Sequence, residues 1–185
     1  MKIITLLIAL FSLGVFAQEL NQFLNKFNTE ELSFTSSKTK YNLEFFESEQ
    51  DFKDAGLTDL TEDEIQAFVN PYFDNMYTQY YASSKFNLPL GLIGIVVYKN
   101  VVNINSGSET KYYDLIILNS KGEIRGEITL TSWWFDDSSS GAIYSTVSFD
   151  GMNIFVKQYK SFNSGDVDQE EKTFVYDASG EFIEQ

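Results

Sequence analysis

The clearest pattern of polar and apolar positions lies between Lys111 and Trp134. The continuous apolar run 115–118 predicts a strand that is covered on both faces. Beyond residue 123, isoleucine and leucine alternate with charged residues and threonine, which predicts a half-buried strand. Asn119 and Gly122 suit the first and fourth positions of a type I turn, and the glycine also suits a bulged hairpin. The pattern therefore predicts two antiparallel strands joined by a tight turn.

Upstream of residue 87 most of the apolar spacing is helical, although the alternation of Tyr41, Leu43 and Phe45 predicts a strand. Between Leu20 and Phe27, apolar residues fall at positions i, i+3, i+4 and i+7, which predicts a short helix. Thr61 and Glu64 form the signature of a capping box, and apolar residues follow at 65, 68 and 69. This spacing predicts a second helix that begins after Thr61.

Asn70-Pro71 interrupts the second helix, because asparagine suits an N-cap and proline suits the first helical position. We therefore expect a third helix from about Pro71 to Ser84. Its apolar positions recur with helical spacing and include Tyr72, Phe73, Met76, Tyr77, Tyr80 and Tyr81. A stripe of tyrosines can serve as a platform for a ligand, but more often it is a core face with hydroxyl groups at its rim. We expect a core face here.

Downstream of residue 89 the pattern predicts strands almost without interruption. Asp150-Gly151 is the strongest short hairpin signal in the chain. A last pair of strands is expected around Asp177–Gly180, where the sequence resembles the turn at 119–122. A repeated unit would suggest propeller blades, but turns of this composition are common. We attribute the resemblance to turn chemistry.

These elements predict one β-dominated α+β domain. Its body is an antiparallel meander, a curved or partly closed sheet, with two or three N-terminal helices packed on one face or end. Residues 18–88 would form the helical and loop part, and residues 89–185 the meander. β-Propeller-like blades are the alternative architecture.

Residues 1–17 are predicted to be a signal peptide. Lys2 supplies the positive region, Ile3 to Val15 the apolar region, and Val15-Phe16-Ala17 fits the rule for cleavage after small residues. A retained membrane anchor is the weaker interpretation, because a spanning helix needs about 20 apolar residues. We therefore expect cleavage after Ala17 and a secreted or periplasmic protein that does not insert into a membrane.

Charge and composition narrow the function classes. The chain has 13 basic and 27 acidic residues, and removal of Lys2 would shift the formal charge from -14 to -15. Such acidity disfavours nucleic acid as a partner, because phosphates need basic side chains. Without cysteine the chain folds without disulfides, and without histidine it lacks the commonest general base and zinc ligand.

One candidate site follows the predicted hairpin, at Trp133, Trp134, Asp136 and Asp137. Aromatic rings followed by carboxylates can stack on a sugar and hydrogen-bond its hydroxyl groups. A pair of carboxylates can also hydrolyse a glycosidic bond, with a distant glutamate as the second acid. The simpler interpretation is a tryptophan at the end of the sheet and a solvated loop.

A second candidate is a calcium site at Asp166, Asp168 and Glu170, which offer oxygen atoms at alternate positions. The segment lacks the glycine and the distal glutamate of an EF-hand loop. A weak site would suit an exported protein, and calcium is the one cofactor that the sequence suggests. The simpler interpretation is an exposed acidic loop between Ser161 and Gln169.

The sequence therefore predicts an exported binding or interaction module of the cell envelope or extracellular space, and favours a non-enzymatic function. Its partner would be a glycan or another protein. The alternative is a carbohydrate-binding protein or a glycoside hydrolase that uses carboxylates alone.

Overall fold

The computed structural model describes residues 17–30, 38–41, 49–69, 71, 76–135, 140–150, 153–162, 167–176 and 182–184. Residues 17–24 are α-helical. The other elements are β1 Asn28–Thr29, β2 Lys38–Tyr41, α2 Glu49–Asp54, β3 Thr58–Asp59, α3 Glu62–Phe68, β4 Met76–Asn87, the 3-10 turn η1 Pro89–Gly91, β5 Ile93–Asn103, β6 Glu109–Leu118, β7 Ile124–Phe135, β8 Ser140–Asp150, β9 Asn153–Phe162, β10 Val167–Tyr176 and β11 Phe182–Glu184. In the part of the chain that is described, no helix is long and apolar enough to cross a membrane.

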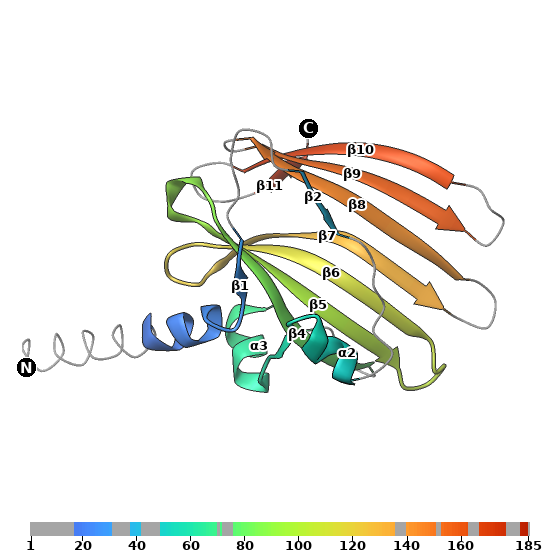
Figure 1. Cartoon of the computed structure of the whole chain (residues 1–185), viewed down its shortest axis with the longest axis horizontal. Helices are drawn as coiled ribbons and strands as arrows, with labels where there is room; N and C mark the ends of the chain where they lie inside the picture. Colours follow the sequence, from blue (N-terminus) through green and yellow to red (C-terminus); the bar gives the residue numbers. More distant parts are fainter. Residues whose placement is uncertain are drawn as a thin grey trace, which may run out of the picture.

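The described strands form one sheet with the order β1-β4-β5-β6-β7-β8-β9-β10-β11 (Figure 1). Strands from β4 onward pair with their sequence neighbours in antiparallel fashion, and β1 pairs with β4 in parallel. The β-dominated α+β class and the antiparallel meander are thus confirmed. The predicted curved or partly closed form of the sheet is wrong, because the sheet is not curled and the order of described strands is open from β1 to β11. The described strands belong to one continuous sheet, so the alternative of β-propeller-like blades is wrong.

The sheet divides between β7 and β8. These two strands pair only where Ser132–Phe135 faces Ser140–Ile143. The next stretch of β8, Ser145–Ser148, pairs instead with β2. Figure 1 shows β8, β9 and β10 fanning away from the lower group β4 to β7.

The central strands are buried on both faces, as the apolar run 115–118 predicted. On one face, the residues 17–24 and α3 pack against the sheet through Leu20, Phe23, Leu24, Phe68 and Val69, which meet Tyr80, Ala82, Ile95, Val97, Ile116 and Leu118. On the other face, Phe52 of α2 joins a second cluster with Tyr81, Val96, Tyr98, Tyr113, Leu115, Ile117, Ile128, Leu130, Ile154 and Val156. The helices therefore do not share one face, in contrast to the prediction.

The turn between β6 and β7 has the predicted geometry. The amide N–H of Gly122 donates to the Asn119 carbonyl at 2.9 Å, and Gly122 has a φ of 75°. The Asn119 side chain accepts from the amides of Lys121 and Glu123 at 2.9 and 3.0 Å. Asp150 and Asn153 likewise pair across the predicted β8–β9 hairpin. The turn at 177–180 lies outside the described residues, but Tyr176 and Phe182 pair on either side of it.

The predicted helix from Pro71 to Ser84 is wrong, because residues 76–87 form β4. Tyr80 belongs to the cluster under the helices, and Tyr81 belongs to the cluster on the opposite face. A strand that is buried on both faces can carry apolar residues at nearly every position, so its sequence also satisfies a helical spacing. The interpretation as core residues is confirmed for Tyr80 and Tyr81 and is wrong for Met76 and Tyr77, which are 42% and 58% exposed. Tyr72 and Phe73 lie outside the described residues.

Candidate functional site

The predicted sugar site is only partly described. Trp133 and Trp134 lie in β7, opposite Ala142 and Gly141 of β8. Asp136 and Asp137 fall outside the described residues. Consecutive positions of a strand lie on opposite faces of the sheet, so the backbone places positions 133 and 134 on different faces. A platform on either face would therefore be built from one of these two positions and from residues of neighbouring strands.

The predicted calcium site is also only partly described. Asp168 and Glu170 lie in β10 rather than in a loop, and they pair with Lys160 and Gln158 of β9. As alternate positions of one strand they share a face, while Asp166 lies outside the described residues. No group of acidic residues that could hold a metal ion occurs within the described ranges. The calcium site stays a prediction.

Strand register assembles a row of polar residues that the sequence did not reveal. Gln79 of β4 pairs with Asn100 of β5, Asn100 with Lys111 of β6, and Lys111 with Trp133 of β7. We call Gln79, Asn100, Lys111 and Trp133 the polar row. It lies beside a row of aromatic residues in which Tyr98 pairs with Tyr81 and Tyr113.

The polar row is sheltered rather than freely exposed. Lys111 is 7% exposed, and its Nζ lies 3.6 Å from Oε1 of Glu109 on the same strand. Asn100 donates from Nδ2 to Oε1 of Gln79 at 3.4 Å. The Oδ1 atom of Asn100 is buried and has no hydrogen-bond partner among the described residues. A buried acceptor of this kind costs free energy unless a donor reaches it.

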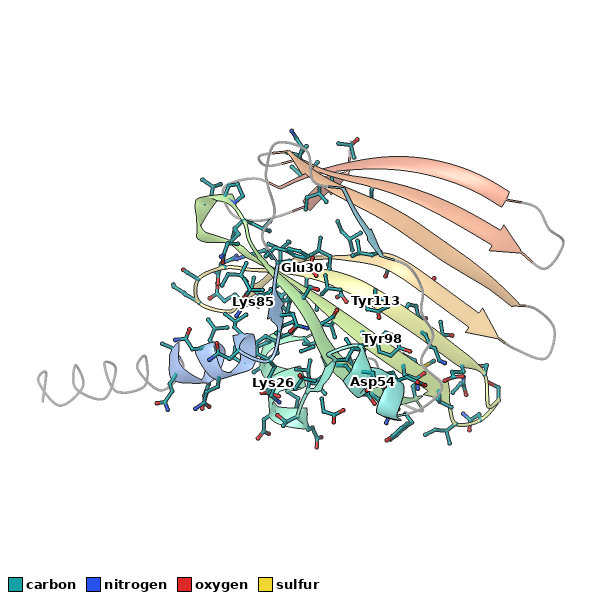
Figure 2. The ribbon with its side chains drawn as sticks, in the orientation of Figure 1. Lys26, Glu30, Asp54, Lys85, Tyr98 and Tyr113 are labelled. Carbon is teal, nitrogen blue, oxygen red and sulfur yellow. The ribbon has the colours of Figure 1, made fainter. Side chains whose placement is uncertain are left out.

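The aromatic row closes one side of the polar row. Phe52 of α2 stacks on Tyr81 with ring centroids 4.5 Å apart, and Tyr98 meets Tyr113 edge-on at 5.0 Å. Figure 2 labels Tyr98 and Tyr113 on the central strands, near α2. Burial raises the pKa of Tyr98 far above its ordinary value, so its hydroxyl group stays neutral. These rings form a rigid wall.

The opposite face of the same strands carries a buried ion cluster of Lys99, Asp114 and Glu127. Lys99 Nζ lies 2.8 Å from Asp114 Oδ2 and 2.6 Å from Glu127 Oε1. The side chains of Lys99 and Asp114 are 1% and 2% exposed, and that of Glu127 is 27% exposed. Lys99 Nζ also lies 5.9 Å from the centre of the Tyr80 ring.

The three charges of the ion cluster determine one another's protonation. Burial alone would lower the pKa of Lys99, but the charges of Asp114 and Glu127 outweigh burial and raise that pKa. Burial raises the pKa of Asp114, only partly offset by Lys99, and the charge of Glu127 raises it further. Lys99 is therefore an ammonium group at rest, and burial favours the protonated form of Asp114.

Sequence reasoning missed both groups for different reasons. The members of the polar row are far apart in the chain and meet only through the register of four strands. Lys99 and Asp114 could have been noticed, because each is a charged residue directly beside an apolar run, 95–98 for Lys99 and 115–118 for Asp114.

Comparisons with protein-family models, with curated proteins and with solved structures give no match for this chain. The function must therefore be inferred from its own residues.

Proposed function

We propose that the protein is an exported, non-enzymatic binding module and that the polar row is its ligand-binding surface. The observation that carries this proposal is the buried Oδ1 atom of Asn100, an acceptor without a described donor beside the ammonium group of Lys111. A ligand hydroxyl group that donates to this atom would remove the cost of its burial.

The chemistry of the polar row favours a carbohydrate as the ligand. Amide and ammonium groups can hydrogen-bond hydroxyl groups, and the tryptophan at position 133 belongs to the same cross-strand row. Binding sites for small molecules commonly combine aromatic side chains with a few polar groups that fix orientation. The acidic chain and the predicted signal peptide support a location in the periplasm or outside the cell.

A specific observation keeps hydrolysis as the second candidate function. Glu109 pairs with Phe135, the residue that precedes Asp136, one of the acids of the predicted site. Glycoside hydrolysis needs two carboxyl groups across the scissile bond, and Glu109 would be the distant glutamate. If the wild-type chain released reducing sugar from a glycan and the Glu109→Gln variant did not, the protein would be an enzyme rather than a binding module.

The binding proposal is tested by titrating the mature chain with a panel of neutral and acidic glycans. Tryptophan emission and calorimetry should both report binding by at least one glycan. Asn100→Leu should weaken binding, with a Kd roughly fivefold higher or more, because the loss of a buried hydrogen bond costs about 1 kcal/mol or more. Asn105→Leu is the matched control, because Asn105 is an exposed residue of the β5–β6 turn.

Two outcomes would contradict the proposal. A panel without any emission change or heat would exclude the carbohydrate class. Equal affinities of the wild type and a folded Asn100→Leu variant would show that the ligand binds elsewhere than at the polar row.

A further inference from the structure

The buried ion cluster brings an amine and a carboxyl group into contact in the protein interior. Lys99 lies on β5, Asp114 on β6 and Glu127 on β7, and strand register fixes all three. Lys99 Nζ contacts one carboxylate at 2.8 Å and the other at 2.6 Å. Contact with Oδ2 places Nζ beside Asp114 Cγ, the carbon atom bonded to that oxygen, so the amine is already next to the atom that it would attack.

Without a covalent bond, the ion cluster lowers the stability of the fold. Two carboxylates face one ammonium group, so the fully ionised cluster keeps a net negative charge; Lys99 and Asp114 are almost fully buried, and Glu127 is 27% exposed. The Oδ1 atom of Asp114 has no hydrogen-bond partner among the described residues, although the side chain is almost fully buried. Buried charges without full hydrogen bonding are strongly disfavoured, and a reaction that removes them would stabilise the fold.

We propose that Lys99 and Asp114 become joined by an intramolecular amide bond, with Glu127 as the group that relays the proton. Glu127 takes a proton from the Lys99 ammonium group, and the neutral Nζ attacks Cγ of the protonated Asp114 carboxyl group. The Nζ–Cγ bond forms, Glu127 gives its proton to the departing hydroxyl group, the C–O bond breaks and one water molecule leaves. Glu127 then takes the second proton from the nitrogen, which leaves a neutral amide. The Lys99 ammonium group and the ionised Glu127 are thereby replaced by a neutral amide, water and a protonated Glu127, without an oxidant or other reactant.

The surroundings support each step. Burial of the Asp114 side chain, 2% exposed, raises its pKa and so favours the neutral acid that a nucleophile requires. Loss of a proton from Lys99 is the unfavourable step, and Glu127 lies 2.6 Å from Nζ to receive that proton. Held at contact distance, the two groups react without the entropy cost of an encounter, and effective concentrations of about 10⁵–10⁸ M are known for such arrangements. Exclusion of solvent opposes hydrolysis of the product.

The wild-type chain provides the primary test. The folded, full-length mature protein is denatured and its intact mass is measured. The expected mass is lower than that of the sequence by one water molecule, and proteolysis should release a branched peptide that links β5 to β6 through Lys99 and Asp114. A protein that is folded by circular dichroism but has the full sequence mass would overturn the proposal.

Variants test the role of Glu127. Glu127→Gln keeps the size of the side chain but cannot take the proton, so it should fold and retain the full mass. Glu123→Gln is the matched control, because Glu123 is an exposed residue near the same end of the β6–β7 hairpin and pairs with Arg125 instead. This control should lose water like the wild type. A Glu127→Gln chain that still forms the Lys99–Asp114 link would contradict the proton relay. Loss of the link in the Glu123→Gln control would contradict the assignment of this relay to Glu127.

Asp114→Asn provides a separate chemical signature. Attack of Lys99 on the carboxamide would release ammonia instead of water and give the same linked product as the wild type. A folded Asp114→Asn chain with the mass of the linked wild type would support the reaction. A linked peptide through a residue other than 114 would refute the assigned partner.

Discussion

At the scale of single residues, Gly122 is constrained by both its backbone and its neighbours. Its φ of 75° disfavours any residue with a Cβ atom, and a Cβ atom there would lie 2.9 Å from Cε1 of Phe68 and 3.0 Å from Cδ1 of Leu20. We expect Gly122→Ala to lower the free energy of unfolding by about 2–4 kcal/mol, from backbone strain plus overpacking. Urea denaturation measures this loss.

Gly107 supplies the control for the Gly122 prediction. It has a similar φ of 69°, but nothing lies within 4 Å of a Cβ atom built there. Gly107→Ala should therefore cost only the backbone strain, about 1–2 kcal/mol. Equal losses at the two positions would show that the contact with Phe68 relaxes without cost.

Glu64 is a residue whose charge stabilises the fold in a pH-dependent way. It accepts from the Thr61 amide at 2.7 Å and pairs with Lys26 Nζ at 2.6 Å. Burial alone would raise the pKa of Glu64, but these contacts outweigh it and lower the pKa below 4.5. A lowered folded-state pKa stabilises the protein above the unfolded-state pKa, and that stabilisation is lost as the pH falls through the folded-state value.

We therefore expect Glu64→Gln to reduce the free energy of unfolding by about 0.5–1 kcal/mol at pH 7, the usual size of such charge interactions. The difference from the wild type should shrink as the pH falls below 4.5. Urea denaturation at several pH values measures it. Glu62→Gln, an exposed residue in the first turn of the same helix, is the control, and an unchanging gap for Glu64→Gln would contradict the assigned contacts.

At the scale of elements, local chemistry was predictable and burial on both faces was not. The turn at Asn119 and the capping box at Thr61 depend on nearby residues, and both have the predicted geometry. β4 was predicted as a helix because its apolar residues come in adjacent pairs, Met76-Tyr77 and Tyr80-Tyr81, and this spacing of four fits a helical period. In the strand, Tyr80 and Tyr81 instead contribute to opposite core clusters.

The same limit applies to the candidate sites. Trp133 could be selected from the sequence because tryptophan beside acidic residues has recognisable chemistry. Gln79, Asn100 and Lys111 are unremarkable until strand register places them in one row. The ion cluster depends on register in the same way, although two charged residues inside apolar strands were a visible signal.

The helical residues 17–24 belong to the folded domain. Phe23 is fully buried, stacks on Phe68 at 4.6 Å and meets Phe27 edge-on. We expect Phe23→Ala to lower the free energy of unfolding by about 3–5 kcal/mol, the usual cost of deleting a buried phenylalanine ring. Thermal and urea denaturation measure the loss. Gln22→Ala, an exposed neighbour, should change stability by less than about 0.5 kcal/mol, and a similarly small effect of Phe23→Ala would mean that this helix is dispensable.

At the scale of the whole molecule, an acidic chain without cysteine must stabilise a sheet that divides between β7 and β8. Strands β5 and β6 contribute to both core clusters, to the polar row and to the ion cluster, and β7 contributes to one core cluster and to both polar groups. A covalent link between β5 and β6 would therefore strengthen the part of the sheet on which the other features depend, in a chain that has no disulfide to do so.

Unfolding experiments should distinguish such a link from a simple ion pair. Closing the chain between Lys99 and Asp114 stabilises the fold by about 3 kcal/mol in the chain-entropy account, which corresponds to a Tm higher by about 6–12 °C in a domain of this size. Loss of an ion pair alone would lower the urea midpoint and leave the m-value unchanged. Loss of the covalent link in Glu127→Gln would also raise the m-value, because the unlinked denatured chain exposes more surface to urea. An unchanged m-value with a lower midpoint would mean that Glu127 acts in this fold only as a charge.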